Sequence, residues 1–444
     1  MAKIIPFRGT RYNIGLFDDL SSLFAPPYDI VTKEERDSYV RQNPYNIFRL
    51  ELPSKADCNG GAADKYRCAA TFLHKWQRER IFLTDHEPAI YPYDIEFVSD
   101  GKAFVRKGFI CLVRTDDWSD GTILPHEKTF QKVTQDRLSL RMTTRAQFSQ
   151  IFMLYRHQEG LDQALGHGSR EELFTVEDAK GCIHKLYRVS DRNSLEQISG
   201  CLSGTPLYIA DGHHRYTTAI QYRKEMTARY GDNPEALYNY TMVYLVDVKD
   251  PGMIVLPTHR LVSIPEGMNC EEVIERLSRL FYLKELEQST QFSGPWQAHE
   301  FKKTLSETCL NGITLLFGSR KRAFVLCPKD EARKELLETV GHRELAELDV
   351  VVLEELVFKK ALGIESERLE AGRDIIFTAD SEGAIRSLKQ HQMLFFMHPT
   401  PVEQVLDVAD AGLSMPHKST YFYPKILTGM VLNLEEKEGM SPSF

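Results

Sequence analysis

A cluster of polar residues follows a short apolar stretch in the middle of the chain. Residues 207–210 are apolar or aromatic, and they lead into Asp211-Gly212-His213-His214-Arg215. Glycine allows a sharp turn with positive φ, and a helix-like segment follows, so the cluster is expected at a strand-to-helix turn. The N–H groups at a helix start attract phosphate, an arginine binds phosphate through two parallel hydrogen bonds, and histidines add donors. This pattern predicts a phosphate-binding turn.

Asp211 adds further chemistry to this turn. A carboxylate there can hold a magnesium ion or polarise a hydroxyl group. In a second interpretation Asp211 only caps the helix, and the histidines pair locally. In a third, the two histidines and Asp211 hold a transition metal, although adjacent histidines point in different directions and chelate less well than an i, i+4 pair. Four polar residues at one turn favour the functional site.

The second candidate is the sequence Pro125-His126-Glu127. Pro125 predicts the start of a helix, which places His126 and Glu127 on its first turn. A partly desolvated glutamate is suited to act as a general base. A solvated glutamate stabilised by the helix dipole explains the same residues, and the sequence alone leaves both interpretations open.

The third candidate lies near the end of the chain, where Lys418, Ser419 and Thr420 follow a Pro-His pair. A lysine beside hydroxyl groups can bind a phosphate or a carboxylate. The segment lacks the Gly-x-x-x-x-Gly-Lys pattern of a P-loop. An ordinary loop with buried aromatic residues at positions 421–423 is the alternative.

Composition narrows the classes of protein. The chain has 444 residues, enough for two or three domains, and its formal net charge of -8 disfavours a broad nucleic-acid-binding surface. No apolar run approaches the roughly 20 residues that span a bilayer, and the N-terminal sequence lacks the apolar core of a signal peptide. We therefore expect a cytoplasmic protein with no membrane partner.

The eight cysteines form no Cys-x-x-Cys pair, so buried thiols are expected rather than structural zinc or a disulfide framework.

Helical and strand-like segments alternate along the chain. Thr32 and Glu35 have the spacing of a capping box at a helix start, and an apolar stripe predicts a second helix over residues 62–81. Asp100-Gly101 between two β-rich runs predicts a hairpin. Further strands are expected at residues 45–52, 150–155, 240–248, 253–262 and 392–397. This mixture predicts an α+β or mixed α/β fold.

Four motifs taken together are similar to a bacterial and archaeal family of unknown function, DUF1015: ADGHHRYTTA, LPHEKT, LPTHR and MPHKSTYFYPK. The resemblance extends from residues 26–31 to residues 427–431, nearly the whole chain. More distantly, the chain resembles the SerK-like free serine kinases of the ParB/sulfiredoxin superfamily. Those kinases have the same ordered set, namely a Pro-His-Glu turn, a strand ending in Asp-Gly-His-His-Arg, and a late Pro-Lys-Thr-Thr stretch that the run from Pro416 resembles.

The kinase resemblance implies a role for each motif. It makes Glu127 the catalytic base toward a serine hydroxyl, and it places nucleotide phosphates and Mg2+ at the Asp211 turn. Asp211 would be the metal ligand and, with His214, a catalytic residue. The phosphate ligands would be the other residues of this turn: Gly212, His213, His214 and Arg215. Substrate or phosphate ligands would come from the two remaining motifs: His126, Lys418, Ser419 and Thr420.

Two departures separate this chain from the kinase pattern. About 80 residues lie between the first two motifs, a longer insert than in the kinases, and His417 stands between Pro416 and Lys418. Other branches of the superfamily match less well. Sulfiredoxins carry a reactive cysteine where this chain has His213, so thiol chemistry is not expected. ParB-type partition proteins need basic DNA-binding surfaces, which the acidic charge balance argues against.

We therefore expect a central ParB/sulfiredoxin-like domain with flanking α/β regions. The predicted boundaries give an N-terminal region over residues 1–110, a catalytic core over 111–262, and a C-terminal domain over 263–444 that completes a cleft. The favoured function is a phosphotransferase that uses Mg2+ and moves a phosphoryl group from ADP or ATP to a small hydroxylated metabolite, with L-serine as first choice. A non-enzymatic nucleotide sensor and a phosphohydrolase are the alternatives.

Overall fold

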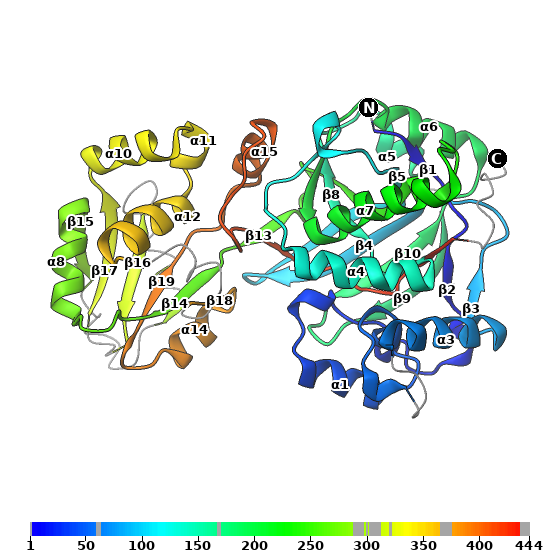
Figure 1. Ribbon diagram of the computed structural model, residues 1–444, viewed down its shortest axis with the longest axis horizontal. Coiled ribbons are helices and arrows are strands. Elements are labelled where there is room, and N and C mark those ends of the chain that lie inside the picture. The colour runs from blue at the N-terminus through cyan, green and yellow to red at the C-terminus, as the bar shows by residue number, and fades with distance from the viewer. Residues whose placement is uncertain are drawn as a thin grey trace. The chain divides into compact units, whose positions relative to one another are not determined.

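The computed structural model describes residues 2–58, 64–166, 170–286, 297–298, 301, 312–318, 322–364 and 375–435 (Figure 1). The chain forms two compact units. The first comprises residues 1–125, 129–254 and 424–444, and the second comprises 126–128 and 255–423. The chain therefore passes between the units four times, and residues 126–128 are a brief excursion into the second unit. Within the described ranges, no helix combines the length and the apolar content that a membrane span requires.

The first unit is built on a nine-stranded sheet in the order β6-β11-β8-β12-β5-β4-β10-β9, with β1 also paired to β5. β8 and β12 run parallel to each other, as do β6 and β11, and the other pairs are antiparallel. β8 and most of β12 are buried on both faces, as their unbroken apolar sequences require. The strands are β1 (Ile4–Ile5), β4 (Tyr91–Ser99), β5 (Lys102–Arg114), β6 (Ile123–Leu124), β8 (Ile151–Tyr155), β9 (Glu171–Glu177), β10 (Ile183–Arg188), β11 (Leu207–Asp211) and β12 (Tyr240–Asp247).

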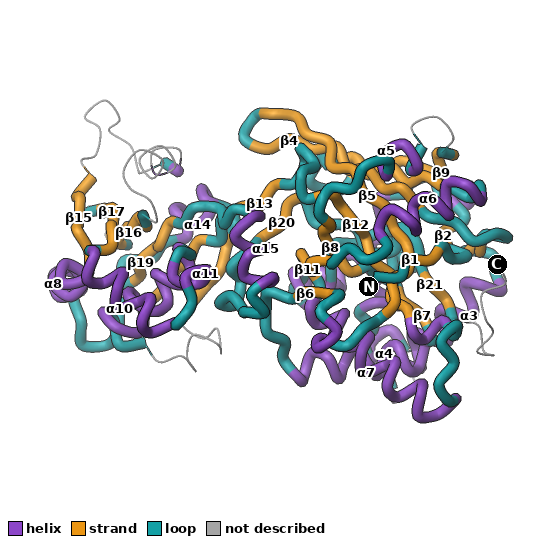
Figure 2. Tube along the Cα trace, turned by 90° about the horizontal axis from the view of Figure 1, so that it is seen from above, coloured by secondary structure: helices purple, strands orange, loops and turns teal. Residues whose placement is uncertain are grey.

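Helices pack against this sheet, and α4 and α7 lie side by side (Figures 1 and 2). The α-helices of the unit are α1 (Lys33–Gln42), α2 (Phe48–Glu51), α3 (Lys65–Arg78), α4 (Gln131–Thr144), α5 (Leu161–Ala164), α6 (Arg192–Leu202) and α7 (His213–Tyr230). Its 3-10 helices are η1 (Ile14–Leu16), η2 (Ser21–Leu23), η3 (Tyr28–Ile30), η4 (Lys55–Asp57), η5 (Trp118–Asp120) and η6 (Leu237–Asn239). Short strand pairs complete it: β2 (Thr10–Tyr12) with β3 (Phe82–Thr84), and β7 (Ala146–Gln147) with β21 (Asn433–Leu434).

The second unit has a six-stranded antiparallel sheet in the order β15-β17-β16-β19-β14-β18. The strands are β14 (His259–Ser263), β15 (Phe281–Leu286), β16 (Ile313–Phe317), β17 (Ala323–Pro328), β18 (Ile375–Thr378) and β19 (Gln392–Phe396). The helices are α8 (Cys270–Leu280), α10 (Asp330–Val340), α11 (Arg343–Ala346), α12 (Asp349–Val351), the π-helix η7 (Val352–Ala361), α14 (Ser381–Ser387) and α15 (Val402–Asp410). β13 (Ile254–Leu256) and β20 (Tyr421–Tyr423) form a separate ribbon.

The mixed α/β class predicted from the sequence is confirmed by these two sheets and their helices. The capping box is present, because the Thr32 hydroxyl accepts from the Glu35 N–H at 3.2 Å and the Glu35 carboxylate accepts from the Thr32 N–H at 2.8 Å. The hairpin at Asp100-Gly101 joins β4 to β5. The predicted three-part division stays a prediction, and its boundaries at residues 110 and 262 fall inside β5 and β14.

Two strand predictions are wrong in detail. The stretch expected as a strand at residues 45–52 contains the helix α2, because the Asn46 side chain accepts from the Phe48 N–H at 3.0 Å and starts a helical turn. Asn46 is itself buried and donates to the carbonyl groups of Ser22 and Phe24. The strand expected at residues 253–262 is split into β13 and β14, with Pro257 in the gap between them.

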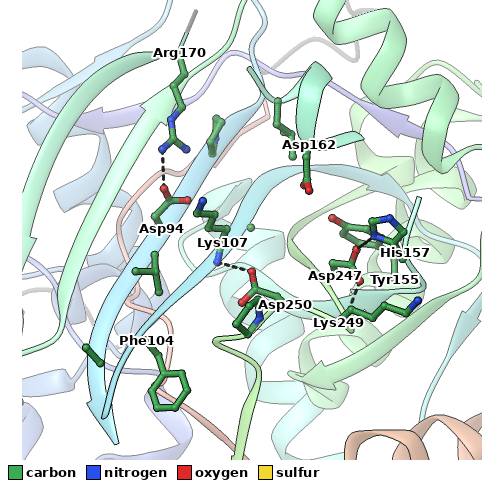
Figure 3. Close-up of a pocket in the computed structure, with 16 residues that line it drawn as sticks. Asp94, Phe104, Lys107, Tyr155, His157, Asp162, Arg170, Asp247, Lys249 and Asp250 are labelled. Atoms are coloured by element: carbon green, nitrogen blue, oxygen red, sulfur yellow. Dashed lines mark hydrogen bonds and ion pairs between the residues drawn. The ribbon is translucent and has the colours of Figure 1, made fainter. Parts of the chain in front are cut away.

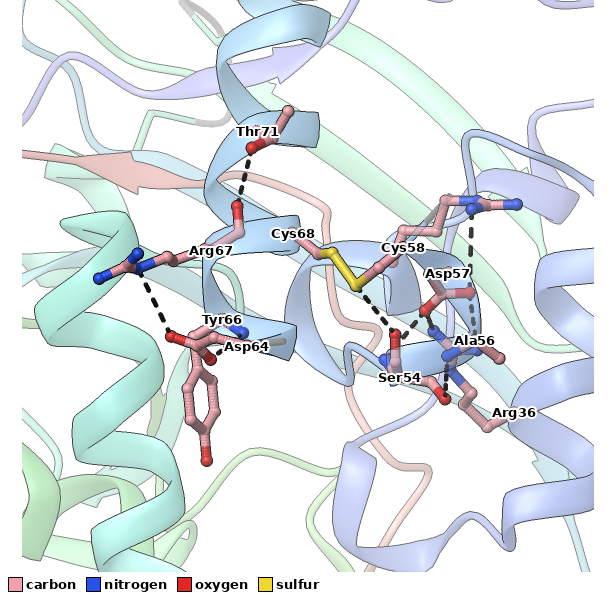
Figure 4. Close-up of a disulfide and its surroundings, with 11 residues drawn as sticks. Arg36, Ser54, Ala56, Asp57, Cys58, Asp64, Tyr66, Arg67, Cys68 and Thr71 are labelled. Atoms are coloured by element: carbon pink, nitrogen blue, oxygen red, sulfur yellow. Dashed lines mark hydrogen bonds and ion pairs between the residues drawn. A yellow bond between two sulfur atoms is a disulfide. The ribbon is translucent and has the colours of Figure 1, made fainter. Parts of the chain in front are cut away.

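The expectation of unpaired cysteines is wrong at Cys58 and Cys68, which form a disulfide between the segment after η4 and the helix α3 (Figure 4). Cys68 lies on the buried face of α3, and its Cα atom is 5.8 Å from that of Cys58. The pairing depends on how η4 packs against α3, which cysteine spacing alone does not reveal. Four described cysteines are free thiols, namely Cys111, Cys182, Cys201 and Cys270, whereas Cys327 is also disulfide-bonded.

The disulfide closes a loop with a sequence separation of 10 residues, so its loss raises the entropy of the unfolded chain. Replacing both Cys58 and Cys68 by Ser should lower the free energy of unfolding by about 2–3 kcal/mol. The shift is measured from urea unfolding followed by tryptophan fluorescence without reductant. Adding a reductant should narrow the difference between the two proteins, because both contain the disulfide-bonded Cys327 but only the wild type also loses the Cys58–Cys68 bond. Equal unfolding midpoints without reductant would show that the two sulfurs are not bonded in solution.

Candidate active site

The polar cluster in the middle of the chain forms a strand-to-helix turn, as the sequence predicts. β11 ends at Asp211, Gly212 has a φ of 100°, and α7 begins at His213. The helix has 18 residues, so its dipole and its first N–H groups favour an anion at this end.

Arg215 folds back over Gly212. A Cβ atom on Gly212 would lie 2.8 Å from Arg215 Nε and 2.9 Å from Nη2, so a larger residue would displace the end of the Arg215 side chain, and the positive φ itself favours glycine. The guanidinium donates from Nη1 to the carbonyl of Gln150, and its Nη2 lies 3.7 Å from Asp211 Oδ1. Only 10% of the side chain is exposed. The arginine is thus held at the helix start before any ligand binds.

Asp211 is paired with a second cation, Lys425. Lys425 Nζ lies 2.8 Å from Asp211 Oδ2, although the two residues are 214 positions apart in the sequence, and each side chain is 14% exposed. The carboxylate therefore lies between an ammonium and a guanidinium group. This arrangement gathers positive charge at the start of α7, with the Asp211 carboxylate between the two cations.

The segment after Pro424 is fixed to the sheet of the first unit by three hydrogen bonds. Arg106 Nη2 donates to the carbonyl of Pro424 at 2.8 Å, the Leu427 N–H donates to the Tyr93 hydroxyl at 3.2 Å, and Gln150 Nε2 donates to the carbonyl of Leu427 at 3.0 Å. Since Lys425 lies inside this segment, these bonds determine where its ammonium group is placed.

The two histidines have different environments. His213 is buried, whereas His214 is partly exposed and stacks on the ring of Phe130 with centroids 5.7 Å apart. His214 Nδ1 accepts from the Phe130 N–H at 3.3 Å, so the neutral ring carries its proton on Nε2. Among the described residues, no group of three or more His, Cys, Asp and Glu side chains is arranged to hold a metal ion.

The predicted helical position of His126 and Glu127 is wrong. α4 begins only at Gln131, and Glu127 forms an isolated parallel bridge with Met415 in the second unit. The Met415 N–H donates to the carbonyl of His126 at 2.8 Å. This pairing requires an extended backbone at Glu127, and therefore the helix starts later than Pro125 suggests.

The structure brings the second and third motifs together within the second unit. His126 is buried, and its Nε2 lies 3.3 Å from the Thr420 hydroxyl, across a sequence separation of 294 residues. Glu127 is partly exposed beside the same turn. An imidazole and a hydroxyl are thus brought together from positions 126 and 420, with the backbone of Glu127 paired next to them.

The turn around Lys418 has an unusual backbone. Lys418 has a φ of 58°, and three carbonyl groups of the turn accept hydrogen bonds: Pro416 from the Ser419 hydroxyl at 2.6 Å, Lys418 from Arg260 at 3.1 Å, and Ser419 from Thr400 at 3.2 Å. The N–H groups of residues 418–420 donate no hydrogen bond to any described residue. Unbonded N–H groups around a left-handed residue form an anion-binding nest.

Arg260 supports this turn from the interior of the second unit. Its side chain is buried, and burial lowers the pKa of the guanidinium to about 10. It donates to the carbonyl groups of Thr258 and Lys418, and it lies over the ring of Phe377 at 5.5 Å from the centroid. Its hydrogen bond to Lys418 thus holds the carbonyl group of the residue with positive φ.

Comparison with known proteins identifies the family. The family model described as "Protein of unknown function (DUF1015)" matches residues 4–351. The chain belongs to the DUF1015 family. No curated protein matches it.

Three solved structures are similar to parts of this DUF1015 chain. A mutant free serine kinase in complex with ADP is 13% identical, covers 72% of this chain and 92% of its own, and gives a TM-score of 0.34. A conserved hypothetical protein from Pyrococcus furiosus is 14% identical, with 72% and 95% covered and a TM-score of 0.32. SbnI with a C-terminal truncation, from Staphylococcus aureus, is 13% identical, with 72% and 85% covered and a TM-score of 0.35.

Two residues of this DUF1015 protein make contacts in the structure that add them to the candidate site. Lys425 and Arg260 stand inside the motifs YFYPK and LPTHR, which the sequence singled out without giving either residue a role. The positions of Lys425 and Arg260 inside these motifs were the signal that the sequence offered. Their hydrogen-bond and ion-pair partners are seen only in the folded structure. The meeting of all three motifs in one cleft stays a prediction.

Gly212→Ala should destabilise the protein more than Gly121→Ala does. Both glycines have positive φ, but a Cβ at Gly121 meets nothing within 4 Å, whereas one at Gly212 meets Arg215. The left-handed conformation alone costs an alanine about 1–2 kcal/mol. Thermal unfolding of the two variants measures the difference. Equal unfolding temperatures would show that Arg215 does not pack over Gly212 in solution.

Proposed function

We propose that this DUF1015 protein is a SerK-like cytoplasmic phosphotransferase that moves a phosphoryl group from ADP or ATP to a small hydroxylated metabolite, with L-serine as first choice. The Asp211 turn carries the proposal, because Arg215, Lys425 and the start of α7 surround one carboxylate. Phosphoryl transfer depends mainly on positioning and charge neutralisation, which these groups supply. The motif resemblance to free serine kinases supports the same assignment.

Each group of the first unit has a proposed role. Arg215 and the first N–H groups of α7 bind the nucleotide phosphates, with His214 Nε2 as a further donor. Mg2+ usually takes one or two carboxylates together with phosphate oxygens, and Asp211 is the residue that would hold it. If Asp211 held this ion, the Lys425 ammonium could pair with a phosphate oxygen in place of the Asp211 carboxylate. The ion would neutralise phosphate charge during transfer.

The second unit supplies the groups proposed for the acceptor. Glu127 takes the proton from the acceptor hydroxyl, and His126 holds the Thr420 side chain beside it. The ammonium of Lys418 and the N–H groups of residues 418–420 bind an anionic group, either the substrate carboxylate or a phosphate. A hydroxyl-bearing acid such as serine carries both of the groups that this arrangement can bind.

Glu127→Gln should lower kcat by about 10²–10⁴, because it keeps the shape of the side chain but removes the proton acceptor. Nucleotide affinity should stay within twofold of wild type. Asp211→Asn is the matched comparison, since it removes a carboxylate in the same isosteric way and should lose nucleotide affinity together with activity. Phosphorylated products are measured by mass spectrometry after incubation with Mg2+, a nucleotide and a panel of hydroxylated metabolites, and nucleotide binding by calorimetry.

The same experiment separates the alternative functions. A Glu127→Gln protein that phosphorylates serine at the wild-type rate would remove Glu127 from the mechanism. Nucleotide binding by the wild-type protein without any phosphorylated product would favour the sensor. Nucleotide consumption with release of free phosphate would favour the phosphohydrolase.

Lys418 offers a test of the backbone nest. Lys418→Gly removes the ammonium but permits the positive φ, whereas Lys418→Val removes the ammonium and disfavours that φ. Loss of a charge-assisted hydrogen bond should raise the apparent KM for the acceptor roughly tenfold to a hundredfold in both variants. Lys418→Val should raise it further, with circular dichroism confirming the fold. An equal KM in the two variants would show that the backbone N–H groups do not bind the acceptor.

A further inference from the structure

The first unit contains a second polar pocket, of about 640 Å³, which the proposed phosphotransferase site does not use (Figure 3). It lies where the parallel strands β8 and β12 end, and their last residues, Tyr155 and Asp247, line it. Asp94 of β4 and Lys107 of β5 line it from the neighbouring hairpin, and Asp162 lines it from α5. The volume lies within the range of about 300–1,000 Å³ that is usual for small-molecule sites.

This pocket is separate from the Asp211 turn. β8 and β11 are antiparallel, with Phe152 opposite Asp211 and Tyr155 opposite Leu207. Tyr155 is three residues beyond Phe152, which corresponds to about 10 Å along the strand and to the opposite face of the sheet. Phe152 contacts Arg106 on one face, whereas Tyr155 belongs to the apolar cluster on the other.

Tyr155 brings a hydroxyl group without a partner into this pocket. The residue is only 3% exposed, yet its hydroxyl makes no hydrogen bond to any described residue. Burial raises its pKa well above the usual value, and the negative charges of Asp247, Asp162 and Asp250 raise it further. The hydroxyl thus stays protonated beside three carboxylates. A molecule bound in the pocket can pair with this hydroxyl and gain affinity.

Of the three carboxylates near Tyr155, two accept hydrogen bonds from described neighbouring residues and one, that of Asp162, does not. Asp247 accepts from His157 Nδ1 at 2.6 Å and from the Lys249 N–H at 2.8 Å. Asp250 accepts from the N–H groups of Gly252 and Lys107, at 2.8 and 3.2 Å. Asp162 has no such partner among the described residues, and it is exposed to solvent. The Asp162 carboxylate can therefore accept hydrogen bonds from a cationic group, and Lys249 is the cation of the chain that lines the pocket nearest to Asp247.

At the opposite end of the pocket, the ammonium group of Lys107 provides a positive charge. Lys107 is directly opposite Asp94 in the β4–β5 pairing, but Asp94 is paired with Arg170 at 2.9 Å. The Lys107 ammonium has no ion-pair partner among the described residues. Figure 3 shows Lys107 beside Asp94 and apart from Asp162 and Tyr155. The pocket thus has one end suited to a ligand's ammonium group and another suited to its carboxylate.

We propose that this pocket binds a free amino acid, with its ammonium group at Asp162 and the Tyr155 hydroxyl, and its carboxylate at Lys107. The proposal is independent of phosphotransfer, because none of these residues belongs to the Asp211 turn. Such a pocket gives the protein a second small-molecule site.

Calorimetry on the full chain tests this site with the twenty common amino acids, with putrescine as an amine without a carboxylate, and with succinate as a carboxylate without an amine. At least one amino acid should bind more tightly than both probes. Asp162→Asn and Lys107→Gln should each weaken its Kd about tenfold, and Tyr155→Phe, which keeps the buried ring, about fivefold. Glu159→Gln, a nearby exposed change outside the pocket lining, should leave Kd unchanged.

Asp211→Asn separates the two sites, because an amino acid bound in this pocket keeps its affinity in that variant. Binding that is lost in Asp211→Asn but retained in Asp162→Asn would overturn the proposal. Putrescine binding as tightly as every amino acid would also overturn it, as would the absence of binding by all twenty.

Discussion

The first unit depends on an ion pair between Asp211 and Lys425, two residues that are 214 positions apart. Both side chains are largely buried, and a buried charge is costly unless an opposite charge or hydrogen bonds compensate it. Pairing therefore fixes the last segment of the first unit against the end of β11, beside the start of α7. A ligand that binds at this turn meets positive charge that is already in place.

Both units hold the backbone beside a candidate-site lysine with the same kind of contact. In each, a buried arginine donates to a backbone carbonyl next to a lysine: Arg106 to Pro424, before Lys425, and Arg260 to Lys418 itself. Arginine suits this position because its planar group has several donors and packs on aromatic rings, which Arg106 does over Phe152 and Arg260 over Phe377. The backbone at Lys418 and next to Lys425 is thus held in place, although the lysine side chains themselves are flexible.

Most of the correct sequence predictions depend on short patterns of neighbouring residues. The capping box at Thr32, the Asp-Gly hairpin and the strand-to-helix turn at Gly212 each depend on a few neighbouring residues, and the fold retains them. The errors arise where distant contacts override local preference. Pro125 indicated a helix start, but pairing with Met415 extends the backbone at Glu127. The partners of Lys425 and Arg260, and the bond between Cys58 and Cys68, likewise depend on packing that no local pattern encodes.

The division of the first unit along the chain has a consequence for its synthesis. Roughly 170 residues of the second unit are made between Ile254 and Pro424. At the usual rate of about 5–20 residues per second, the ribosome needs about 10–30 s to make them. During that interval Asp211 and Arg215 have left the ribosome, but Lys425 has not been made. The charge arrangement at the start of α7 is therefore completed only after the second unit has been made, when the segment that contains Lys425 joins a sheet whose strands are already synthesised.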